Sequence, residues 1–105
     1  MEDFKDLVIN TTLLRIYEDG KIERYKNNDW VLIENTSNHK KGYNVIMIDK
    51  KQYMRSRLIC HVFKDMDLKS KYVIHYLDFN RLNCRVDNLS IETPISLKKH
   101  YKASL

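Results

Sequence analysis

The 105-residue chain has only two glycines and one proline, so it has few free hinges and no flexible low-complexity linker. Its two cysteines, Cys60 and Cys84, stand alone without a CxxC pair. This argues against a zinc site built on them and favours reduced, intracellular thiols. No run of about 18 apolar residues exists, so no membrane-spanning helix is predicted. The first ten residues, MEDFKDLVIN, are acidic and lack an apolar signal core, so we expect a protein of the cytoplasm or nucleus.

The composition is that of one globular domain with a basic surface. Hydrophobic residues make up 43% and charged residues 31% of the chain, values typical of a folded protein. The length fits a single domain, residues 1–105, with a core of modest size. The net charge of +5 favours an anionic partner, with nucleic acid first. The alternative is a basic surface that keeps the protein soluble and has no such partner.

The first half of the chain is rich in strand patterns. Residues 13–26, LLRIYEDGKIERYK, predict a β-hairpin with Asp19-Gly20 as a two-residue turn, because this pair readily supplies positive φ angles. Residues 30–33, WVLI, and 42–48, GYNVIMI, predict further strands. We therefore expect a small N-terminal β-module over about residues 12–53.

Residues 55–63, RSRLICHVF, predict a helix. Apolar residues recur at the spacing of one helical face, at Leu58, Ile59, Val62 and Phe63. The opposite face is predicted to present the basic residues Arg55, Arg57 and His61.

Residues 73–93, VIHYLDFNRLNCRVDNLSIET, predict two short strands joined by a polar loop. The loop is rich in residues whose side chains bond to nearby backbone, namely Asp78, Asn80, Asn83, Asp87 and Asn88. Pro94 follows, and then a basic tail, ISLKKHYKASL, which we expect to be helical. The whole pattern predicts an α+β fold, in which residues 54–105 hold one helix followed by a ββα unit at about 71–103.

These segments resemble the HNH endonucleases of the His-Me finger superfamily, in the homing-endonuclease-like form common in phages and large DNA viruses. YMRSRLICHVF is similar to the family's R-H-R-[LI]-[IV]-A-x-x-F helix. VIHYLDFNRLNCRVDNLSIET is similar to its D-x-N-x-x-N-N-x-x-x-N-L core, in which the phrase D-F-N-R-L-N-x-R-x-D-N-L is the specific part. The resemblance implies a ββα core and a viral or mobile-element origin, in a host cell or in a virion.

The resemblance also assigns roles by position. In this family a divalent metal lies between the first strand and the helix, and a strand His takes a proton from the attacking water. The metal position falls on His75 and the base position on Tyr76, a side chain that titrates near about pH 10. The helix ligand falls on Leu97, which cannot bind a metal, and a His of the preceding helix is replaced by Ser56. The Asn that braces the loop is kept as Asn88.

The kept and changed positions together imply the fold without the cleavage. The loop-bracing set remains, and it comprises Asp78, Asn80, Asn83 and Asn88. The general base and one metal ligand are replaced, so we expect no catalytic residues and no cofactor. Mg²⁺ or another divalent cation is expected only if activity is retained, with His75 and His100 as its candidate ligands.

Three functions follow from this reading. The first is a catalytically impaired HNH-fold protein that binds nucleic acid, most simply double-stranded DNA. The residues expected to contact it are Arg55, Arg57, Arg81, Arg85, Lys98, Lys99 and Lys102. The second is an HNH fold that serves as a protein-binding or structural component of a larger assembly, with the loop at 35–41 as a candidate contact. The third is a divergent but active metal-dependent endonuclease.

Overall fold

The computed structural model describes residues 3–103, and the side chains of residues 3–99. In this part of the chain the fold is α+β, as predicted, with eight strands and two α-helices. The elements are β1 (Phe4–Ile9), β2 (Thr12–Tyr17), β3 (Ile22–Lys26), β4 (Asp29–Ile33), β5 (Val45–Ile48), β6 (Lys51–Met54), α1 (Arg55–Phe63), β7 (Val73–Tyr76), the single 3-10 turn η1 (Val86–Asn88), β8 (Leu89–Glu92) and α2 (Pro94–Ala103). Neither described helix has the length and apolar character needed to cross a bilayer.

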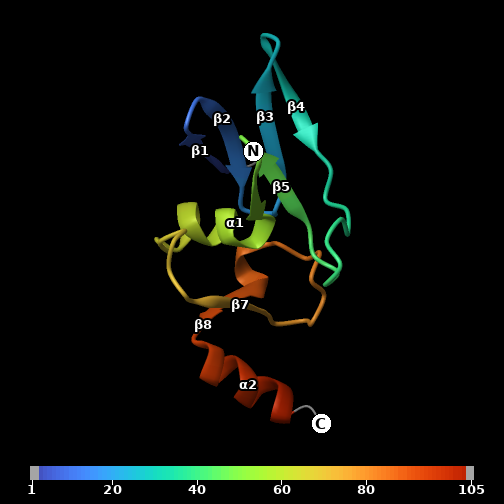
Figure 1. The fold of residues 1–105 in the computed structure, drawn as a ribbon, viewed down its shortest axis with the longest axis vertical. Helices are drawn as coiled ribbons and strands as arrows, with labels where there is room; N and C mark the ends of the chain where they lie inside the picture. The colour runs from blue at the N-terminus through green and yellow to red at the C-terminus, as the bar shows by residue number, and fades with distance from the viewer. Residues whose placement is uncertain (1–2, 104–105) are drawn as a thin grey trace.

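The strands form three separate antiparallel sheets. β1 to β4 make a four-stranded meander in sequence order, and β5–β6 and β7–β8 are two-stranded hairpins. Figure 1 shows the meander at one end of an elongated molecule, α1 across its middle, the β7–β8 hairpin beyond α1, and α2 at the far end. The chain therefore places α1 between its β-rich first half and its second half, which holds β7, β8 and α2.

Asparagine and aspartate make most of the tight turns in a chain with so little glycine. Asn27 and Asn28 join β3 to β4 with φ angles of 53° and 64°. Asp49 and Lys50 join β5 to β6 with φ angles of 50° and 66°. Positive φ at both central residues is the mark of a type I′ hairpin, whose twist matches that of the strands. Asn10, with φ 54°, likewise opens the turn after β1. The sequence patterns above predict neither β1 nor β6 as a strand.

Gly20 closes the predicted hairpin between β2 and β3. The Tyr17 N–H donates to the carbonyl of Lys21 (2.9 Å), so three residues lie in the turn and not the two expected. Gly20 has a φ of 95°, which only glycine adopts readily. A Cβ at this position would lie 2.9 Å from the main-chain carbonyl carbon of Cys84. The turn therefore packs directly on the loop that precedes η1.

The hydrophobic core is continuous from the β-rich first half to the half that holds β7 and β8. The predicted apolar face of α1 points into it, with Leu58 and Ile59 fully buried. Around them lie buried side chains from five strands and from the connecting loops, among them Leu14, Ile16, Ile22, Ile46, Ile48, Met66, Ile74, Cys84 and Leu89. Because the three sheets share one core, burial of these apolar side chains holds the sheets in place relative to one another.

Arg55 departs from the predicted exposed face of α1, because only 1% of its surface is exposed. Its Nε donates to Asn44 Oδ1 (2.9 Å), and its Nη1 donates to the carbonyl of Gly20 (2.8 Å). Its Nη2 donates to the carbonyl of Ile33. One side chain thus ties the β2–β3 turn, the end of β4 and the segment before β5 to α1. This burial argues against the predicted contact of Arg55 with nucleic acid, because its donors face the protein and are covered.

Candidate functional site

The loop between β7 and β8 is held by one carboxylate and three asparagines. Asp78 Oδ1 accepts from the N–H of Asn80 (2.8 Å) and from Asn88 Nδ2 (2.9 Å). Asp78 Oδ2 accepts from Asn83 Nδ2 (2.8 Å). Asn88 Oδ1 accepts in return from the N–H of Asp78 (3.1 Å), and Asn88 Nδ2 also donates to the carbonyl of Asn83 (2.9 Å). The four residues expected to brace the loop thus belong to one network.

These bonds also favour the charged form of the Asp78 carboxyl. Donation from the Asn83 side chain, followed by donation from the Asn80 N–H, lowers the pKa of this carboxyl below its usual value. The stability that it contributes is present at neutral pH and is lost as the pH falls through the lowered pKa. Both carboxylate oxygens already accept hydrogen bonds from loop residues, so Asp78 stabilises the conformation of the loop.

Tyr76 stands at the end of β7 and points toward α1. Its hydroxyl lies 2.8 Å from Ser56 Oγ, and both residues are buried. The two positions where the HNH resemblance expects histidines are therefore in direct contact here. Burial raises the pKa of Tyr76 to about 12, although the Ser56 hydrogen bond opposes the rise. A phenol with this pKa cannot take a proton from water near neutrality.

His75 lies on the opposite face of β7, as alternate strand residues do. It is 4% exposed, and its ring packs edge-on against Phe79, with centroids 5.1 Å apart. The described residues contain no group of three or more His, Cys, Asp or Glu side chains able to hold a metal ion. The side chain of His100 lies outside the described residues, so a site shared by His75 and His100 stays a prediction.

A pocket of about 260 Å³ opens beside Tyr76, between β7, α2 and the segment at 41–43. Its apolar and aromatic walls include Tyr43, Met54, Tyr76 and Leu97. Its basic walls are Lys41, Arg57 and Arg81. None of the described residues that line it is acidic or a histidine. The pocket that contains the expected base and helix-ligand positions is therefore cationic and lacks metal-binding side chains.

Arg57 is half-buried and lines this pocket. Its Nη2 donates to the carbonyls of Leu68 (3.0 Å) and Ser70 (2.9 Å), and its Nη1 donates to that of Tyr72. Carbonyls are neutral, so these bonds fix the guanidinium and the loop between α1 and β7 without cancelling the positive charge. Arg57 thus has a structural role that the sequence did not indicate, and it can still attract an anion.

The other predicted basic contacts whose side chains are described are exposed, but they lie in different places. Arg81 donates to the carbonyl of Lys41 and thereby joins the β7–β8 loop to the segment at 41–43. Arg85 is exposed and lies 3.4 Å from Asp87. Lys98 and Lys99 are exposed on α2. The side chain of Lys102 lies outside the described residues.

Three basic residues were not among the predicted nucleic-acid contacts, namely Lys41, which lines this pocket, and Lys51 and Lys69, which line an adjacent pocket between β6, α1 and the loop after α1. They come from three segments that are far apart in the sequence, and no motif connects them. The sequence indicated only Lys41, because it ends the loop at 35–41 that is expected to contact a partner.

Comparison with protein-family models, curated proteins and solved structures finds no match. What the protein does must therefore be inferred from its own residues and geometry.

Proposed function

We propose that this protein is an HNH-like ββα protein that binds nucleic acid through its phosphates and does not cut it. The order β7, Asn-braced loop, β8 and α2 supports the assignment, because it is the order of the ββα core. The hydrogen bonds between Asp78, Asn83 and Asn88 support it further, since the family keeps polar residues at these positions to hold the loop.

The chemistry of the pocket at Tyr76 argues against cleavage. Hydrolysis of a phosphodiester needs an activated water and a means of stabilising the charge on the leaving oxygen. Tyr76 is protonated, buried and bonded to Ser56, so it cannot activate water. A divalent metal requires oxygen or imidazole ligands, and Leu97 offers neither. The described residues therefore do not fit the metal that the family uses.

The same pocket favours phosphate binding. Lys41, Arg57 and Arg81 line it, and no described acidic side chain offsets them there. Basic side chains that neutralise phosphates release condensed counterions, which is the main source of affinity for nucleic acid without regard to sequence. The proposal rests on one observation. The pocket is lined by positive charges, and it holds Tyr76 and Leu97 at the positions of the family's general base and helix metal ligand. Arg85, Lys98 and Lys99 would add peripheral contacts.

A salt titration tests the binding. Fluorescence anisotropy of a labelled DNA duplex, with chelator present, should give a log affinity that falls linearly with log salt concentration. The slope should be about −0.9 for each phosphate neutralised. Lys41→Ala and Arg81→Ala should each flatten the slope by about one unit.

Lys26→Ala is the matched control, because Lys26 is exposed at the end of β3, remote from the pocket lining. It removes one positive charge and should leave the slope nearly unchanged. Absence of binding at low salt would overturn the proposal. If Lys41→Ala and Arg81→Ala keep the slope of the unaltered protein, as Lys26→Ala should, the pocket does not contact phosphates.

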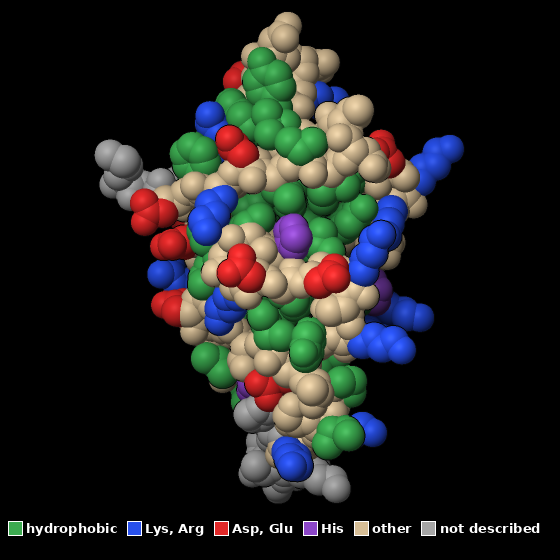
Figure 2. All heavy atoms as spheres, turned by 90° about the vertical axis from the view of Figure 1, so that its left-hand side faces the viewer, with side chains coloured by type: hydrophobic (Ala, Val, Ile, Leu, Met, Phe, Trp, Pro, Cys, Tyr) green, Lys and Arg blue, Asp and Glu red, His purple; other side chains and the backbone are tan. Residues whose placement is uncertain are grey.

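A second candidate function rests on the outer face of the four-stranded sheet. Phe4, Val8, Tyr25 and Leu32 lie on this face by strand register and are 43–62% exposed. Figure 2 shows hydrophobic side chains gathered over the end of the molecule that this sheet forms. Exposed apolar patches mark protein contacts, so this face favours the protein-assembly reading. Crosslinking followed by mass spectrometry in the native source would identify such a partner.

A further inference from the structure

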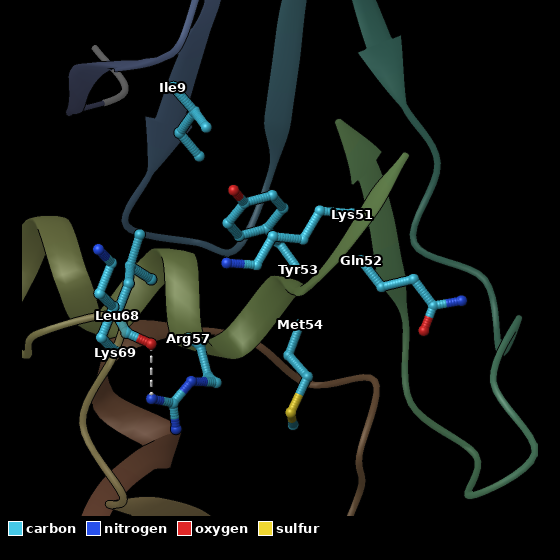
Figure 3. A pocket seen from close by; sticks show the side chains of 8 residues that line it. All are labelled: Ile9, Lys51, Gln52, Tyr53, Met54, Arg57, Leu68 and Lys69. Carbon is cyan, nitrogen blue, oxygen red and sulfur yellow. Dashed lines mark hydrogen bonds between the residues drawn. The ribbon is translucent and has the colours of Figure 1, made fainter. Parts of the chain in front are cut away.

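A second pocket lies on the other side of Met54 and Arg57. It has a volume of about 330 Å³ and is formed by the end of β1, by β6, by α1 and by the loop that follows α1 (Figure 3). It shares Met54 and Arg57 with the pocket at Tyr76. The two pockets are therefore adjacent, and the side chains of Met54 and Arg57 contribute to both.

The walls of this second pocket are held in place by hydrogen bonds. Tyr53 and Met54 belong to β6, which pairs with β5 residue by residue. Leu68 stands opposite, on a loop that Arg57 holds by donating to its carbonyl (3.0 Å). Figure 3 shows this bond, with the Tyr53 ring facing the space between β6 and the loop. A ligand would therefore meet a largely preformed site.

The lining combines a flat aromatic surface with positive charge. Ile9, Met54 and Leu68 supply apolar walls, and the Tyr53 ring is half-buried among them. The Lys51 ammonium lies over that ring, 5.4 Å from its centroid. Lys51, Arg57 and Lys69 bring three positive charges, and no described lining residue is acidic. The complementary ligand is a flat, partly apolar ring that carries a negative group.

We propose that this second pocket receives an unpaired nucleobase, stacked near Tyr53, while Lys51, Lys69 and Arg57 contact the flanking phosphates. A base that is paired within a duplex cannot leave its stack without breaking the pair, so only a single strand enters freely. Stacking of bases on aromatic side chains, beside a basic groove that follows the backbone, is how single strands are bound without sequence preference. The protein therefore prefers single-stranded over double-stranded nucleic acid. This inference rests on the proposed function and names its substrate class.

The test compares a labelled single strand with a duplex of the same length, at one salt concentration and without metal. The single strand should bind more tightly. Tyr53→Leu should weaken single-strand binding by roughly 5- to 150-fold, the range found when a stacking side chain is removed, and should leave duplex binding nearly unchanged. Tyr25→Leu is the matched control, since Tyr25 is an exposed strand tyrosine that lines neither pocket.

A second measurement leaves the protein unaltered, so it holds even if Tyr53→Leu folds poorly. A series of strands, each with one abasic site, should contain a position at which binding is clearly weakened. Equal affinity for single strand and duplex, with no effect of Tyr53→Leu or of any abasic site, would overturn this inference while leaving the proposed function intact. Failure of both nucleic acids to bind at low salt would overturn both.

Discussion

At the scale of single residues, Arg55 shows how a basic side chain can serve the fold alone. Its guanidinium donates to two carbonyls and one amide oxygen in three different segments, and it is almost fully covered. Arg55→Met should lower the free energy of unfolding by about 3 kcal/mol or more, because it leaves buried acceptors without donors. Arg55→Lys should recover little, since one ammonium cannot reproduce the planar fork.

Chemical denaturation with urea measures this effect. Arg85→Met is the control, because Arg85 is exposed and its loss should change stability by no more than about 0.5 kcal/mol. An Arg55→Met protein as stable as the control would contradict the role assigned to Arg55.

The two glycines allow a sharper comparison of backbone strain with steric contact. Both have positive φ, 95° at Gly20 and 90° at Gly42. A Cβ at Gly42 would have its nearest neighbour 3.9 Å away, whereas a Cβ at Gly20 would press on the main chain of Cys84 at 2.9 Å. Gly42→Ala should therefore cost about 1–2 kcal/mol from strain alone, and Gly20→Ala should cost clearly more. Thermal unfolding of both variants checks this. Equal losses of stability would mean that the backbone at Gly20 or Cys84 shifts to make room for the Cβ.

At the scale of elements, β7 and α2 bring the changed positions together. Tyr76 and Leu97 line the same pocket although 20 residues separate them in the sequence. If the alignment with HNH proteins is right, Tyr76→His combined with Leu97→Asn should create measurable affinity for Mn²⁺. Isothermal titration calorimetry would detect it, with Tyr76→Phe as the control that removes only the hydroxyl.

The double variant also loses the Ser56 hydrogen bond, so its folding should be checked by circular dichroism. A folded double variant that binds Mn²⁺ no better than the control would argue against this alignment.

Elements with strong local signals were predictable from sequence. The helix at Arg55–Phe63, the hairpin around Gly20 and the Asn-rich loop each follow from periodicity or turn chemistry, and each is present. β1 was missed, because three of its six side chains are charged or exposed aromatic residues and its turn contains no glycine. The burial of Arg55 was missed for a different reason. Helical spacing placed it on the polar face, but tertiary contacts at the start of the helix cover it.

At the scale of the whole molecule, the basic surface is assembled from distant segments. Lys41, Lys51, Arg57, Lys69 and Arg81 line two adjoining pockets and come from loops, a strand and a helix. The net charge of +5 predicted an anionic partner, but only the folded chain shows where that charge is concentrated without acidic neighbours. The anionic partner expected from the sequence therefore stays a prediction, and the surface that would bind it could not be predicted.

The most direct test of the account measures binding and cutting in one sample. Supercoiled plasmid would be incubated with the protein at low salt and with Mg²⁺ or Mn²⁺. One portion would be assayed for retention on a filter, and the other would be freed of protein and assayed for nicks. We predict retention that disappears at high salt, with no nicking above the buffer background. Metal-dependent nicking that is lost in His75→Ala would contradict the account, because it would show that a working nuclease site survives in this chain.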